Sequence, residues 1–248
     1  MTAALRQFLA ALLLAIAARA DTLEEANALY AGGDYAKAAS ACEALIESEG
    51  ATASRLFNLA NARYQLKEYG PAILACERAA LLAPRDADIR ATLKLARDAA
   101  SVHDEVPPGT WWEQVLHWGS LHEWSWLAIS GALLVAAAAL VSGFLGLRRA
   151  WLNRVVLASL SGGFLLIALS HFVLWARREE GKLAIVTAAK PVLRLSPFPT
   201  ADEAGSCGTG RAVYPGERVN GWVHVTLRGT TTTGWLRESE LAQLMPDA

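Results

Sequence analysis

Two long apolar runs dominate the hydropathy pattern of the chain. Residues 127–147 and 155–175 each contain 21 residues without Asp, Glu, Lys or Arg. At 1.5 Å per residue, a helix of this length covers a hydrocarbon core of roughly 30 Å. The connection at 148–154 is short and carries three arginines. The pattern predicts a transmembrane helical hairpin over 124–175, with both outer ends on one face of a membrane.

Small residues recur at a spacing of four within these runs, which favours close helix packing. Two explanations stay open: the two spans pack on each other, or they pack on the spans of a partner protein. The residues are Ala128, Ala132 and Ala136, then Ala138, Ser142 and Gly146, and in the second run Ser159 and Gly163.

The segment 21–100 repeats itself with a period of 34 residues. A fixed period of this length, with small residues at close-packing positions, is similar to the tetratricopeptide repeat. The resemblance implies an array of α-helical hairpins. The identical pairs are Ala26/Ala60, Asn27/Asn61, Ala28/Ala62, Tyr30/Tyr64, Tyr35/Tyr69, Ala38/Ala72, Cys42/Cys76 and Glu43/Glu77.

Individual residues fit this arrangement. Ala60 and Ala72 occupy positions where the two helices of one hairpin approach, and Tyr69 lies at the corner between them. Pro84 ends the second helix of its unit, because proline cannot continue a helix. Residues 86–99 predict a third helix that covers the last hairpin as a cap.

The resemblance places the first helix of each unit along a binding groove. Members that capture a peptide carboxylate combine asparagines with lysines, whereas Leu23 and Phe57 stand at the lysine positions here. Binding of a free C-terminal carboxylate is therefore not expected. Either the groove binds another peptide segment, or its polar groups only satisfy neighbouring helices. The groove residues are Asn27, Tyr30, Asn58, Asn61 and Tyr64.

After Gly181 the pattern changes to short β-branched runs separated by turns, as in Val223, Val225 and Leu227. Residues 183–248 predict a small five-stranded all-β barrel. The elements VLRLSPFP, PGERV, GWVHV and GWL resemble a bacterial SH3-like domain, with Trp222 and Trp235 on its candidate binding surface.

The N-terminus indicates export. Residues 1–20 combine Arg6, an apolar run and a final Ala-Arg-Ala, which is typical of a secretory signal peptide. The arginines at 148, 149 and 154 favour a cytoplasmic turn, because positive charge stays on the cytoplasmic side. Arg177, Arg178 and Lys182 argue the other way, and the exported N-terminus decides between them. Both soluble regions are then predicted on the periplasmic side of a bacterial inner membrane.

The linker at 101–123 contains Pro107-Pro108-Gly109, which breaks helical structure. Tryptophans then become frequent, and their amphipathic rings favour the headgroup region. We expect an interfacial helix at 110–123. The tryptophans of this approach are Trp111, Trp112, Trp118, Trp124 and Trp126.

Composition excludes several function classes. The net charge of −1 gives no electrostatic basis for binding nucleic acid. Cys42, Cys76 and Cys207 form no CxxC site, and for Cys42 and Cys76 buried free thiols are a better interpretation than a disulfide. No catalytic residues, metal ligands or cofactor motif stand out, so a non-enzymatic protein is expected.

The order of modules completes the picture of a multidomain membrane protein. A signal peptide, a short tetratricopeptide array, a two-span hairpin and an SH3-like domain together resemble the BatE-type proteins of bacterial aerotolerance operons. That resemblance implies a scaffold or adaptor beside other membrane proteins, among them von Willebrand A domain proteins and, through these, a MoxR-type ATPase. The alternative is an envelope protein that binds peptidoglycan through its SH3-like domain.

Overall fold

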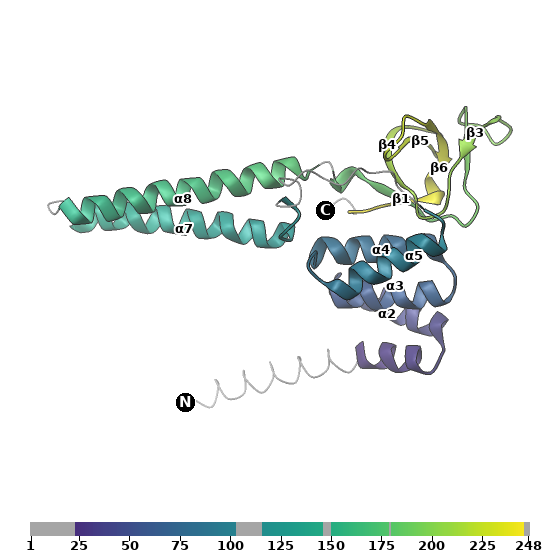
Figure 1. Cartoon of the computed structure of the whole chain (residues 1–248), viewed down its shortest axis with the longest axis horizontal. Coiled ribbons are helices and arrows are strands. Elements are labelled where there is room, and N and C mark those ends of the chain that lie inside the picture. Colours follow the sequence, from purple (N-terminus) through teal and green to yellow (C-terminus); the bar gives the residue numbers. More distant parts are fainter. Residues whose placement is uncertain (1–22, 103–115, 146–149, 179, 246–248) are drawn as a thin grey trace. The chain divides into compact units, whose positions relative to one another are not determined.

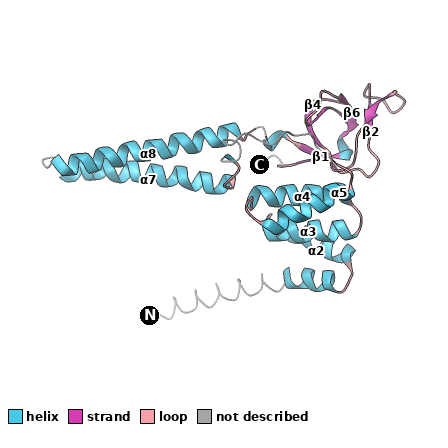
Figure 2. Cartoon of the chain, viewed as in Figure 1, coloured by secondary structure: helices cyan, strands magenta, loops and turns pink. Residues whose placement is uncertain are grey.

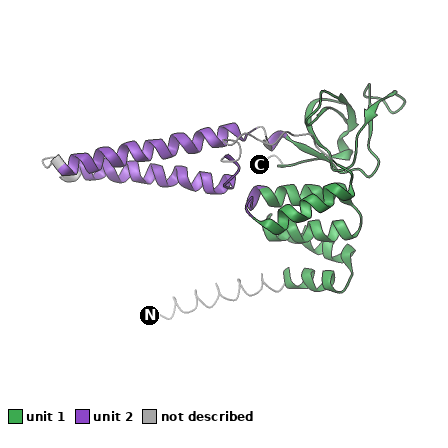
Figure 3. Cartoon of the chain, in the orientation of Figure 1, with its two compact units in different colours: residues 1–80, 86–106, 183–248 green, residues 81–85, 107–182 purple. Residues whose placement is uncertain are grey.

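The computed structural model describes residues 23–102, 116–145, 150–178 and 180–245. The predicted signal peptide at 1–20 lies outside these residues. Figure 3 shows the chain divided into two compact units. The first comprises residues 1–80, 86–106 and 183–248, and the second comprises residues 81–85 and 107–182.

The helices of the first unit follow the predicted repeat (Figure 1). Side-chain caps explain where three of them begin, because Asp34, Thr52 and Asp86 each accept a hydrogen bond from a backbone N–H of the first turn. The helical segments are residues 23–31, α2 (Tyr35–Glu49), α3 (Ala53–Gln65), α4 (Tyr69–Leu82) and α5 (Ala87–Ala99). The predicted capping helix at 86–99 is therefore confirmed as α5, and α4 ends just before Pro84.

Small side chains form the packed interior of this helical region. Ala60, Ala72 and Cys76 are fully buried, and Ala60 belongs to one apolar cluster with Ala75 and Cys76. Larger side chains at these positions would hold the helices apart. The prediction that Ala60 and Ala72 are close-packing positions is confirmed.

The corner of each hairpin repeats in detail. Tyr30 packs against Tyr35 with ring centroids 5.2 Å apart, and the equivalent Tyr64 packs against Tyr69 at 5.8 Å. The backbone also has positive φ at equivalent positions, with 81° at Gly33 and 63° at Lys67. The two corners therefore have the same backbone conformation, although only the first has glycine, the residue that adopts positive φ without strain.

The C-terminal part is an antiparallel sheet (Figure 2). Its strands are β1 (Ala184–Val186), β2 (Val192–Arg194), β3 (Glu203–Ser206), β4 (Ala212–Val219), β5 (Trp222–Leu227), β6 (Thr233–Arg237) and β7 (Leu241–Gln243). They are paired in the order β3-β2-β6-β5-β4-β1-β7.

This topology corrects the predicted five-stranded barrel. The sheet has seven strands among the described residues, and the outer strands β3 and β7 do not pair, so it is not closed. The predicted alternation along β5 is confirmed, because Val223, Val225 and Leu227 all belong to the core. Asn220 and Gly221, both with positive φ, form the tight turn between β4 and β5.

The second unit contains α7 (Leu121–Leu145) and α8 (Ala150–Ala176), called here the apolar hairpin. Both helices are long and apolar enough to cross a membrane. Only 11% and 17% of their most apolar stretches is buried within the chain. Arg154, which the sequence placed in the turn, lies in α8.

The two helices approach most closely at glycines. A Cβ atom added to Gly131 would lie 2.8 Å from the carbonyl oxygen of Gly163, which only glycine tolerates. The stripe of Ala128, Ala132 and Ala136 does not form the contact between the two spans, since Ala132 and Ala136 are exposed; packing of this stripe on a partner's spans stays a prediction. Ala138 and Gly163 do lie in the contact.

The predicted interfacial helix at 110–123 is interrupted. Residues 110–115 lie outside the described residues, and residues 117–120 form a turn before α7 begins at Leu121. Ser120 and Glu123 cap α7 reciprocally: Ser120 N–H donates to the Glu123 carboxylate at 2.8 Å, and Glu123 N–H donates to Ser120 Oγ at 3.2 Å. The buried Arg177 donates to the carbonyl of Gly119 at 2.8 Å, which fixes this turn against the end of α8.

Candidate functional site: a polar hollow between the first helices of the repeat

Four of the five predicted groove residues lie around one cavity. It has a volume of about 190 Å³ and receives side chains from residues 23–31, α2 and α3. We call it the asparagine hollow. Its lining residues are Ala26, Asn27, Tyr30, Ala38, Cys42, Asn58 and Asn61.

The asparagines come together because the repeat places them on successive first helices. Asn58 Nδ2 donates to Asn27 Oδ1 at 2.7 Å, and this pair is exposed. Tyr30 is held from the second hairpin, because Gln65 Nε2 donates to its hydroxyl at 3.3 Å. Each paired amide keeps further donor or acceptor capacity, since an asparagine side chain offers two donors and an acceptor oxygen.

The hollow has no charged residue in its lining. Tyr30 and Cys42 are its titratable groups, and burial, followed by the charge of Glu43, raises the pKa of the Cys42 thiol. A raised pKa keeps this sulfur protonated at neutral pH, so it is a poor nucleophile. The chemistry of the site is therefore neutral hydrogen bonding beside a small apolar floor.

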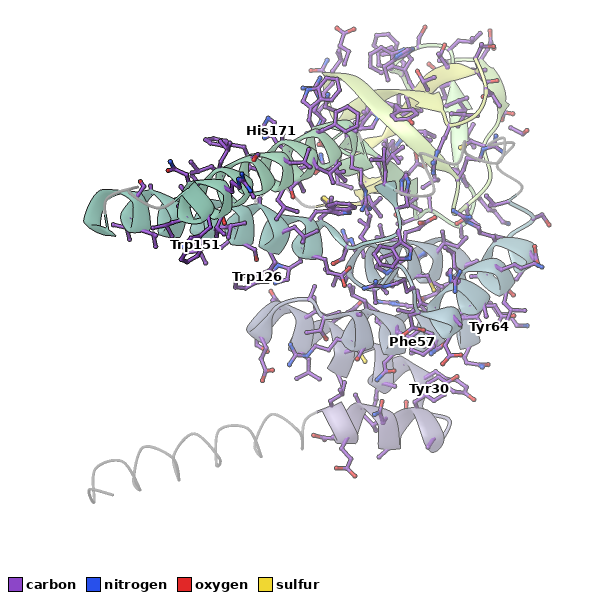
Figure 4. The ribbon with its side chains drawn as sticks, turned by 60° about the vertical axis from the view of Figure 1, so that its left-hand side comes forward. Tyr30, Phe57, Tyr64, Trp126, Trp151 and His171 are labelled. Atoms are coloured by element: carbon purple, nitrogen blue, oxygen red, sulfur yellow. The ribbon has the colours of Figure 1, made fainter. Side chains whose placement is uncertain are left out.

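Tyr64 is the predicted groove residue that does not line the hollow. It lies on the second hairpin, where it packs against Tyr69. Figure 4 shows Tyr30, Phe57 and Tyr64 on the helical region. Cys42 was missed as a lining residue because its identity with Cys76 indicated a core position.

A larger cavity of about 540 Å³ lies at the corner between α3 and α4, beside Thr187 and Thr209. Arg63, one of two cations in its lining, is paired with both Glu43 and Glu68. Because two carboxylates already neutralise this guanidinium, it leaves little positive charge to attract an anion into the cavity.

The sheet carries the second predicted surface. Trp222, His224 and Trp235 lie on one face of β5 and β6, opposite the core residues. His224 and Trp235 are a cross-strand pair with ring centroids 5.2 Å apart. Trp222 is only 8% exposed, and the Arg237 guanidinium lies 5.4 Å from its ring centroid. Trp235 is therefore the more accessible of the two tryptophans on this face, because Trp222 is largely covered.

No group of three or more His, Cys, Asp or Glu residues that could hold a metal ion occurs within the described part of the chain. All three cysteines are buried free thiols; this was predicted for Cys42 and Cys76 but not for Cys207.

No protein family, curated protein or solved structure matches the chain.

Proposed function

We propose that the protein is a non-enzymatic, membrane-anchored scaffold that holds a segment of a partner polypeptide in the asparagine hollow. The single observation that carries this proposal is the exposed Asn27–Asn58 pair, with Asn61 and Tyr30 beside it. A side-chain amide has the same donor and acceptor groups as a peptide bond, so it can bind a polypeptide backbone of almost any sequence.

The neutral lining defines the ligand further. A charged terminus would find no counter-charge there, whereas an extended internal segment needs none. The helical region would then be a short tetratricopeptide array, and the apolar hairpin would be its anchor in the bacterial inner membrane. By the BatE-type resemblance, the partners are other membrane proteins, such as von Willebrand A domain proteins associated with a MoxR-type ATPase.

Affinity purification from gently solubilised membranes tests the proposal. The double variant Asn27→Ala/Asn58→Ala removes both members of the exposed pair, so neither amide is left without its partner. We expect the co-purifying proteins to be lost while the thermal unfolding midpoint stays nearly unchanged.

Ser54→Ala is the matched control, because Ser54 is an exposed residue of the same helix α3 outside the hollow. It should retain every partner. Recovery of the same proteins with the double variant, or of no stable partner with the wild type, would contradict the proposal.

A second candidate function is peptidoglycan binding by the sheet, which would then act as an SH3-like domain. The pairing of His224 with the partly exposed Trp235 favours it, because an aromatic face can stack on sugar rings or peptide stems. Sedimentation of the full-length protein with purified sacculi tests this function. Trp235→Ala should abolish co-sedimentation and Asn27→Ala/Asn58→Ala should not.

A further inference from the structure

Helix α4 is more apolar than its place in a two-helix hairpin requires. Its sequence is YGPAILACERAALL, and its buried residues are Gly70, Ala72, Ile73, Leu74, Ala75, Cys76 and Ala79. Packing against neighbouring helices buries one stripe of a helix, whereas an apolar surface all round indicates contacts on further sides. Gly70 and Ile73 therefore require a second covering element.

The C-terminal sheet is that element. A Cβ atom on Gly70 would overlap Thr209 Oγ1 and would lie 2.8 Å from the carbonyl oxygen of Val186. From the other side, a Cβ atom on Gly210 would overlap Ile73 Cδ1. The helix and the sheet thus approach each other through two glycines, and Ile73 becomes fully buried.

Arg78 makes the polar part of the same contact. Its Nη2 donates to the carbonyl of Gln243 at 2.8 Å, and its Nε donates to the carbonyl of Leu244 at 3.1 Å. Gln243 ends β7, an outer strand of the sheet, so Arg78 occupies a carbonyl group at a sheet edge that could otherwise pair with another chain. Burial lowers the pKa of Arg78, in keeping with its place inside the contact.

We propose that the C-terminal sheet is a permanent cap of the helical region, docked on α4 through Gly70, Gly210 and Arg78. The two parts then act as one body, although the apolar hairpin separates them in sequence. Docking has two consequences. The α4 face is closed to partner proteins, so they have to bind elsewhere, as the proposed function has them bind in the asparagine hollow. Both ends of the apolar hairpin also lie on the same side of any membrane it crosses.

Hydrogen–deuterium exchange of the full-length protein in detergent micelles tests the docking. Gly210→Ala introduces the Cβ atom that overlaps Ile73, and Gly221→Ala is the matched control. The two glycines have φ of 80° and 79°, but a Cβ atom on Gly221 meets no atom within 4 Å. The local backbone cost is therefore the same, and only Gly210→Ala strains the contact.

We expect peptides of α4 to exchange several-fold faster in Gly210→Ala than in the wild type, and at the wild-type rate in Gly221→Ala. Equal exchange of α4 in the two variants, whether fast or slow, would overturn the proposal.

If Gly210→Ala does not fold, Gly70→Ala provides the test. Alanine stabilises a helix relative to glycine, so this change does not by itself loosen α4. Faster exchange of β1 in that variant therefore supports docking, and unchanged exchange of β1 refutes it. Neither result depends on recovery of a partner protein, which keeps this test separate from that of the scaffold.

Discussion

Small residues at repeat positions determine how closely the helices of this protein pack. Ala60 is fully buried within a cluster that includes Ala75 and Cys76, and it has no room for a longer side chain. The repeat indicated this from the sequence, because the same residue type recurs at Ala26.

Replacement of Ala60 by leucine should lower the free energy of unfolding by about 1–3 kcal/mol, since extra methylene groups strain a packed core. Ala91→Leu on the exposed face of α5 should change it by less than about 0.5 kcal/mol. Thermal or urea unfolding in detergent measures both values. Equal effects would mean that the interior near Ala60 is loosely packed.

The two hairpin corners provide an internal comparison of backbone conformation. Lys67 has a φ of 63°, at the position where the first hairpin has Gly33. Lys67→Gly should therefore stabilise the fold by up to about 1 kcal/mol, because glycine adopts positive φ without strain. The same change at Lys94, within α5, should destabilise it by a similar amount. A loss of unfolding free energy in Lys67→Gly would contradict the strain assigned to this corner.

The buried thiols make the free energy of unfolding depend on pH in the alkaline range. Burial is the main cause that raises the pKa of Cys76 to about 12 and that of Cys207 to about 11, against an ordinary value of 9.0. Above pH 9 the unfolded chain loses protons that the folded chain retains, so stability is fully present below pH 9 and falls as the pH rises.

We expect the loss to reach about 1 kcal/mol per thiol by pH 10. Unfolding curves between pH 7 and 10 should therefore fall less steeply for Cys76→Ala than for the wild type, whatever the offset between them at pH 7. Parallel curves would show that Cys76 ionises alike in both states.

At the scale of elements, the apolar hairpin depends on the crossing of α7 and α8. A Cβ atom on Gly163 would lie 2.6 Å from Val135 Cγ2, whereas one on the adjacent Gly162 meets nothing within 4 Å. Gly163→Leu should therefore separate the helices and lower the thermal midpoint in detergent by several degrees. Gly162→Leu should leave the midpoint nearly unchanged, and a similar drop in both variants would place the contact elsewhere.

Elements with an extended sequence pattern could be predicted from the sequence, and those without one could not. The 34-residue repeat located the helices, the hollow and its asparagines. Strands β1, β2 and β7 have three residues each, which is too short for an alternating pattern to emerge. In the hairpin, Gly163 was named among the small residues but Gly131 was overlooked, because alanines at a spacing of four are more numerous there. Gly70 gave no signal, because a glycine near a helix start does not reveal what packs against it.

At the scale of the whole molecule, docking of the sheet on α4 makes a prediction about topology. Cysteines introduced at Lys37 and Glu217, both exposed, should react alike with a thiol reagent that cannot cross the inner membrane. The reagent is applied to cells whose outer membrane is permeable to it and whose inner membrane is intact. A cysteine at Asn153, near the start of α8, should react only after lysis. The native thiols are buried and give little background. Opposite labelling of the first two positions would exclude one docked body.

The strands that cover Arg78 and Ile73 are synthesised last, so these two residues of α4 have no covering element until translation is nearly complete. About 170 residues separate Ile73 from Leu244, so at 5–20 residues per second roughly 10–30 s pass before the sheet can form. During that interval the apolar side of α4 stays uncovered. The nascent chain is therefore open to aggregation at this helix until the last strand has emerged.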